Sequence, residues 1–223
     1  MEKALLYKEW KKTELFVWGI FGVGIILLTY TFLKLGRSFR FVGMEHLIDV
    51  IVNRKQFAYT DMKYYPLAAG LCLGLAQYIP EMIQKRIKLT LHLPLNENRI
   101  IALMYSYGLG VLLFIFTVDN IGIIVFTRIN FPLEIMVNYI VTSIPWYIAG
   151  LVAYSFVAMI CLEPTWSRRV FNVLIGAGTV KLSFISSLPA AQEPVIGLLL
   201  VLTVIVIPFG FLSVYRFKQG KHN

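Results

Sequence analysis

Six long apolar runs alternate along the chain with shorter segments that hold most of the charged residues. Each run is close to the roughly 20 residues that a helix needs to cross the hydrocarbon core of a bilayer. The pattern predicts an all-α polytopic membrane protein with six transmembrane helices in a single domain over residues 1–223. The predicted spans are approximately 15–33, 64–80, 100–118, 138–161, 170–188 and 195–215.

The fourth and fifth runs depart from a simple apolar span. No charged residue occurs from Ile135 to Leu162, a stretch of 28 residues. One transmembrane span needs only about 20 residues, so we expect a helix that is tilted or kinked at Pro145. The fifth run is interrupted by Lys181. A lysine at the centre of a bilayer costs roughly 2.5 to 3.5 kcal/mol on insertion scales, so this residue needs an explanation.

The first 14 residues mix lysines with leucines and aromatic residues, a composition typical of a helix that lies on the membrane surface. We therefore expect an interfacial helix over residues 1–14. Its apolar face is interrupted, because Glu9 falls between Leu5 and Leu6 on a helical wheel.

The segment 81–99, between the second and third apolar runs, is basic and partly amphipathic. Its apolar residues recur every four positions from Ile83 to Leu91, so one face of a helix can pack on the protein. Pro94 ends that helix, and Asn96 can cap the next one by accepting from its first amides. The pattern predicts a small surface helix joined to two spanning helices.

Composition supports a membrane protein and argues against a nucleic-acid site. The chain is 58% hydrophobic and 15% charged, whereas soluble domains are about half apolar and a quarter charged. Its net charge of +9 comes from basic residues gathered at the ends of the apolar runs. Such residues set the orientation of the spans and contact anionic membrane lipids. We expect no nucleic-acid partner.

The distribution of basic residues predicts that both termini lie in the cytoplasm. Residues 1–14, the segment 81–99, the loop at Arg168 and the C-terminal tail are all basic. Basic segments stay on the cytoplasmic side of a membrane, although the connection 34–63 is also basic and is an exception. The chain is expected in the cell inner (cytoplasmic) membrane as a multi-pass protein.

The sequence lacks the motifs of common catalytic sites. The glycines and lysine of residues 176–181 lie within an apolar run and do not have the spacing of a phosphate-binding loop. There is no His-Glu-x-x-His pair and no Gly-x-Ser-x-Gly motif. Cys72 and Cys161 both lie in apolar runs, which favours small buried residues over a disulfide or a metal site. We expect no enzymatic activity, cofactor or metal in this chain.

The segment from Glu81 to Ile101 resembles the first inner loop of ABC transporter permeases of the second exporter class (ABC-2 type). In that family a glutamate after the second span opens the loop, a leucine-rich helix follows, and a proline and a polar residue precede the third span. The residues that match in kind are Glu81, Ile87, Leu89, Leu91, Pro94, Leu95, Asn96 and Ile100. The departures are Lys85 and Arg86 in place of Gly-Thr, and His92 and Leu93 in place of small residues.

The resemblance implies a transmembrane permease subunit of an ATP-driven exporter. ATP would be hydrolysed by a separate ABC ATPase subunit, expected in two copies, on which the loop 81–99 would dock as a coupling helix. A second permease subunit, the same chain or a different one, would complete the translocation path. The residues assigned to ATPase coupling are Glu81, Lys85, Arg86, Ile87, Lys88, Leu91 and Pro94. The cargo and the direction of transport stay open.

Other interpretations also stay open. The loop 81–99 is also consistent with a basic cytoplasmic hairpin that only obeys the charge bias of membrane proteins. A haem-handling permease of cytochrome c maturation is similar in size, but no loop motif matches it. A membrane-embedded enzyme or assembly factor would have no ATPase partner. The spacing from Glu81 to Pro94 favours the transporter.

Two residues are candidates for the translocation path, Lys181 and Gln77. Lys181 has three interpretations: a structural lysine whose ammonium group reaches toward the interface, a residue near headgroups, or a cation in the cleft between subunits. In the third, it would attract an anionic cargo such as a lipid or acidic glycan headgroup. Gln77, like Asp119, Asn120 and Gln192, lies near the end of a predicted span, where polar residues are ordinary.

Overall fold

The computed structural model describes residues 2–42, 59–83, 96–186 and 191–206. Helices account for nearly all of this part of the chain, and it contains no strand. The helices are α1 (Glu2–Val42), α3 (Tyr65–Ile83), α5 (Glu97–Asn130), α6 (Leu133–Leu162) and α7 (Trp166–Leu182). A short helix η1 (Thr60–Met62) precedes α3, and η2 (Glu193–Val195) opens an apolar helical run over Glu193–Val206.

Four of these helices are long and apolar enough to cross a membrane: α1, α3, α5 and α6. The prediction of an all-helical, multi-pass membrane protein is confirmed to this extent. The fifth and sixth predicted spans correspond to shorter helices, α7 with 17 residues and the run Glu193–Val206. Residues 207–215 of the sixth span lie outside the described residues. Six spans and cytoplasmic termini therefore stay predictions.

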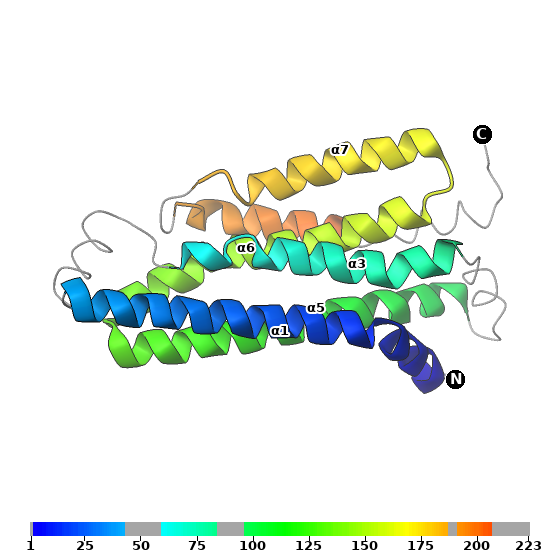
Figure 1. The fold of residues 1–223 in the computed structure, drawn as a ribbon. Helices are drawn as coiled ribbons and strands as arrows, with labels where there is room; N and C mark the ends of the chain where they lie inside the picture. Colours follow the sequence, from blue (N-terminus) through cyan, green and yellow to red (C-terminus); the bar gives the residue numbers. More distant parts are fainter. Residues whose placement is uncertain (1, 43–58, 84–95, 187–190, 207–223) are drawn as a thin grey trace.

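Two helices extend beyond the spans predicted for them. α1 joins the expected interfacial segment 1–14 and the first span in one continuous helix, whose first turns bend away from the axis of the rest (Figure 1). α5 continues past the predicted end of the third span at Val118 to Asn130. Its helix does not end at Asp119, because this carboxylate is buried among neighbouring helices instead of meeting water.

The helices pack in three layers (Figure 1). α3 and α6 make the most extensive contact and lie in the middle layer, α1 and α5 cover one side, and α7 packs on α6 from the other. The central contact is close because glycines meet there: a Cβ on Gly70 would clash with the carbonyl oxygen of Gly150. Small residues are the usual means by which membrane helices approach each other.

Two open apolar grooves run along α1, one on each side. The groove between α1 and α5 has a volume of about 540 Å³ and is lined by residues that include Trp10, Trp18 and Phe114. The groove between α1 and α3 has a volume of about 360 Å³ and is lined by residues that include Phe16 and Cys72. α1 is therefore packed less completely than α3 or α6.

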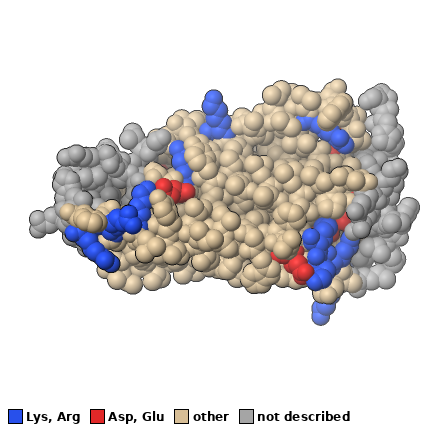
Figure 2. Space-filling model, in the orientation of Figure 1, with Lys and Arg blue, Asp and Glu red and all other residues tan. Residues whose placement is uncertain are grey.

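Most charged side chains on the face in Figure 2 lie toward its two ends, with a wide region of few charged side chains between them. On α1 the uncharged stretch from Leu15 to Leu33 separates the two groups. Lys12, at one end, and Lys34, which pairs with Asp61 Oδ2 at 2.7 Å at the other, lie 22 residues apart. At 1.5 Å per residue this is about 33 Å, which matches a hydrocarbon core of about 30 Å.

Candidate functional site

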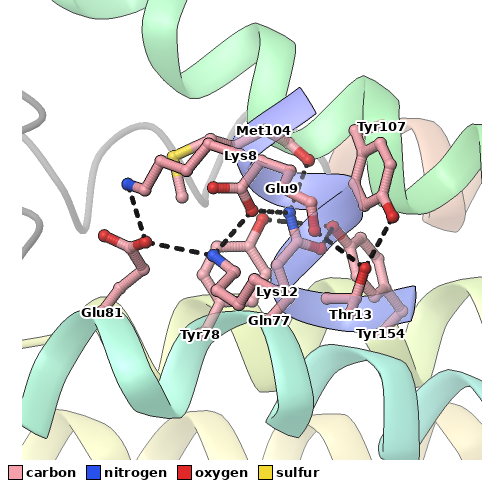
Figure 3. Close-up of polar contacts among 10 residues, drawn as sticks. All are labelled: Lys8, Glu9, Lys12, Thr13, Gln77, Tyr78, Glu81, Met104, Tyr107 and Tyr154. Carbon is pink, nitrogen blue, oxygen red and sulfur yellow. Dashed lines mark hydrogen bonds and ion pairs between the residues drawn. The ribbon is translucent and has the colours of Figure 1, made fainter. Parts of the chain in front are cut away.

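Charged and polar side chains from four helices meet at one end of the bundle, where α1 and α5 begin and α3 and α6 end (Figure 3). We call this end the N-terminal end and the group the polar cluster. Its members come from residues near the start of α1, the last turns of α3, the first turns of α5 and the second half of α6. They are Lys8, Glu9, Lys12, Thr13, Gln77, Tyr78, Glu81, Met104, Tyr107 and Tyr154.

Glu81 is held by two lysines of α1. Its carboxylate is fully buried, and Oε1 lies 2.9 Å from Lys8 Nζ and 3.1 Å from Lys12 Nζ. Lys12 also lies 2.7 Å from Oε2 of Glu9, which is fully buried as well. The second oxygens, Glu9 Oε1 and Glu81 Oε2, have no hydrogen-bond partner among the described residues. Two buried carboxylates therefore depend on the ammonium groups of α1 for their charge balance.

Gln77 connects three helices to α3 by hydrogen bonds. Its Nε2 donates to Glu9 Oε2 at 3.0 Å and to the Met104 carbonyl at 2.9 Å. Its Oε1 accepts from the Tyr154 hydroxyl at 2.7 Å, and the side chain is fully buried. The amide is thus occupied by α1, α5 and α6. A role of Gln77 in the translocation path stays a prediction.

Further contacts of tyrosine hydroxyls surround this core. The Tyr78 and Tyr154 hydroxyls lie 3.2 Å apart, and because Tyr154 donates to Gln77, Tyr78 is the donor of that pair. Tyr107 of α5 and Thr13 of α1 share a hydrogen bond of 2.6 Å between their hydroxyls. The polar cluster therefore joins α1 to α3 and α5 through ion pairs and side-chain hydrogen bonds.

Both ends of the segment expected to form the coupling loop contact the first turns of α1. At the end of α3, Glu81 pairs with Lys8 and Lys12. At the start of α5, Arg99 forms an ion pair with Glu2. The loop is thus flanked by two attachments to one short stretch of helix.

The predicted cap of α5 is confirmed. Asn96 occupies the N-cap position, and its side chain accepts from the backbone N–H of Asn98 at 3.2 Å. Of the residues assigned to ATPase coupling, the structure describes only Glu81, whose coupling role stays a prediction. The following residues lie outside the described part of the chain, and their roles also stay predictions: Lys85, Arg86, Ile87, Lys88, Leu91 and Pro94.

Lys181 occupies a different position from the one expected. α7 begins at Trp166 and ends at Leu182, so Lys181 lies in its last turn instead of near the middle of an apolar helix. Its side chain is exposed, whereas Gly176 of the same helix packs against Phe156 of α6. A lysine in the last turn lies beside the partial negative charge of the helix end, which stabilises it. A role in the translocation path stays a prediction.

Sequence reasoning missed the partners of Glu81. Lys8, Glu9 and Lys12 were assigned to a surface helix, where charged residues are common. The available signal was Glu9 itself, since a carboxylate on the apolar face of a helix needs a buried partner. In the structure that face is continuous, because Leu5, Glu9 and the residues at four-residue intervals after them, Thr13 and Val17, are all buried.

Comparisons of the chain with family models, with curated proteins and with solved structures found no match. The segment between α3 and α5 is flanked on both sides by ion pairs to α1.

Proposed function

We propose that the chain is the transmembrane permease subunit of an ATP-driven ABC transporter, an exporter, coupled to a separate ATPase subunit through the loop 81–99. The observation that carries this proposal is the attachment of both ends of the loop to the first turns of α1, by Glu81 and by Arg99. A loop fixed in this way transmits a displacement of its docked partner instead of absorbing it.

The polar cluster gives this displacement a route into the bundle. When the ATPase subunits close on ATP, the docked loop moves, and Glu81 moves with it. Lys8 and Lys12 then carry the motion to α1, since separating a buried carboxylate from its lysines costs several kcal/mol. α1 is the helix that receives the motion, and it reaches the opposite end of the bundle as one continuous element.

The exposed surface of the bundle is suited to membrane lipids and to a second permease subunit. α1 exposes large apolar side chains along its membrane-spanning stretch, among them Leu15, Trp18 and Ile26, and α7 exposes Phe171 and Leu174. An alternating-access path between two permease subunits requires helices that can move against each other. The partner permease is the same chain or a different one.

The test is co-purification from membranes in a mild detergent. The wild-type chain is expected to bring down an ABC ATPase, and reversing the charges of Lys85, Arg86 and Lys88 to glutamate is expected to release it. The reason is that a docked helix would then present the opposite charge to its groove. The matched control is reversal of Arg37 and Arg40, which are exposed basic residues at the other end of α1.

The proposal is contradicted if the loop variant retains the ATPase with unchanged ATP turnover. A wild-type chain that brings down no ATPase would instead favour a membrane enzyme or assembly factor. Release of the ATPase by the control variant as well would show a general loss of folding, and the free energies of unfolding of the two variants distinguish that case.

A further inference from the structure

Asp119 of α5 is a buried carboxyl group near the middle of the membrane-spanning part of the bundle. Its side chain is 0% exposed, and it is the only charged residue in the sequence from Ile100 to Thr127. It lies beside Gly24 of α1. Gly24 is close to the midpoint between Lys12 and Lys34, about 18 Å along α1 from the first and about 15 Å from the second.

Three other helices surround this carboxyl group, and none of them offers it a positive charge. In the part of the chain that the structure describes, the titratable groups that interact with Asp119 are Tyr65 of α3 and Tyr147 of α6. α1 contributes Gly24, and its sequence from Leu15 to Thr29 has no titratable side chain. Neither Oδ1 nor Oδ2 of Asp119 has a hydrogen-bond partner among the described residues.

Gly24 makes the space in which Asp119 and Tyr65 approach each other. A Cβ on Gly24 would lie 2.5 Å from the Tyr65 hydroxyl oxygen and 3.0 Å from Asp119 Oδ1. Both oxygens therefore border the same point on the surface of α1. Any larger residue at position 24 would have to displace one of them.

The hydroxyl of Tyr65 is already committed as a donor. It donates to the backbone carbonyl of Ile20 at 3.0 Å, which leaves only its lone pairs for Asp119. An ionised carboxylate has no proton to donate and would face another acceptor in a region of low dielectric constant. A protonated carboxyl group instead donates to the tyrosine oxygen and carries no charge.

We propose that Asp119 is a proton-binding site inside the helix bundle, which holds one proton while α1, α3 and α5 are packed together and releases it when the middle of α1, around Gly24, separates from α3. In the packed state the carboxyl O–H donates to the Tyr65 oxygen. Separation breaks the bond from Tyr65 to Ile20 and admits water, which takes the proton and leaves the carboxylate solvated. The site is independent of the ATPase coupling proposed above.

Infrared difference spectroscopy of the full-length protein in detergent at neutral pH tests this directly. Subtracting the spectrum of Asp119→Asn from that of the wild type should leave a carbonyl stretch of a protonated carboxyl group. Asp61→Asn is the matched control, because Asp61 pairs with Lys34 and is expected to contribute only carboxylate bands. A carboxylate band in place of the acid band for Asp119 would overturn the proposal.

Tyr65→Phe provides a second measurement that does not depend on replacing Asp119. Removing the acceptor should shift the acid band to higher frequency, the position of a carboxyl group without a hydrogen-bond acceptor. An unshifted band would contradict the contact with Tyr65.

Proton release on unfolding is a third measurement. Unfolding in a denaturing detergent at neutral pH should release one proton more per chain from the wild type than from Asp119→Asn, and equal release would contradict proton binding.

Discussion

Glu81 and Asp119 are both fully buried acidic residues of membrane-spanning helices, yet their surroundings are opposite. Glu81 has two ammonium groups within 3.1 Å, whereas Asp119 faces a glycine and two tyrosines. The difference follows from depth. Near the end of the bundle a lysine can keep its ammonium group close to the interface and still reach a buried carboxylate. At mid-depth no lysine can do so cheaply, and neutralisation by a proton replaces the ion pair.

Replacing the carboxyl group of each residue with an amide should separate the two cases most clearly. Glu81→Gln is expected to lower the free energy of unfolding by about 3 kcal/mol, the lower end of the range for breaking a buried ion pair, because Lys12 retains Glu9. Asp119→Asn is expected to change it by less than about 1 kcal/mol, since one neutral hydrogen-bonding group replaces another. Unfolding titrations in mixed detergent measure both, and equal losses would show that Asp119 is ionised.

Filling the space at Gly24 should disturb the Asp119 site without changing any charge. Gly24→Val is expected to cost about 1 to 3 kcal/mol of unfolding free energy, because its side chain would push against the Tyr65 ring and the Asp119 carboxyl. The control is Gly22→Val, where a Cβ would meet nothing within 4 Å, with an expected change below about 0.5 kcal/mol. Equal effects at the two positions would mean that the glycines matter only for helix flexibility.

The smallest effect on stability is expected at the second attachment of the loop. The side chains of Arg99 and Glu2 are 65% and 39% exposed, so Glu2→Gln should change the free energy of unfolding by no more than about 0.5 kcal/mol. If the loop transmits ATPase motion, the same variant should nevertheless lower transport per ATP hydrolysed in proteoliposomes. Unchanged transport per ATP would show that Glu81 alone couples the loop to α1.

Much of the helical framework could be predicted because long uncharged runs have few alternatives in a membrane. The run at 138–161 lies within α6, the run at 64–80 lies within α3 except for its first residue, and the cap at Asn96 follows from local chemistry alone. The predicted ends of helices were less accurate where a charged residue was taken to mark the end of a span. α7 begins at Trp166 despite Arg168 and Arg169, and Nε of Arg169 donates to the Glu163 carbonyl at 2.7 Å.

The contacts of the candidate site were beyond sequence reasoning for a physical reason. Lys12 and Glu81 are separated by 69 residues, and only the packing of α1 against α3 brings them together. Asp119 was interpreted as the exit of a span because an aspartate in an apolar segment usually meets water. A glycine on α1 and a tyrosine on α3 create its buried environment, and no local pattern around position 119 reports either of them.

The close contact of Gly70 with Gly150 divides the bundle into a fixed part and an exchangeable part. In a membrane, ordinary apolar contacts between helices can be replaced by lipid tails at little cost in free energy. Lipid tails cannot pack as closely as the backbones of α3 and α6 do at Gly70 and Gly150, so separating these two helices would leave unfilled space. We call this pair of helices the frame. α1 has open apolar grooves on both sides, and apart from the polar contacts of its first turns it packs through ordinary apolar side chains such as Leu28 and Phe32. The part of α1 beyond its ion-paired first turns can therefore leave the frame and return to it, because lipid tails can replace the apolar contacts that are lost.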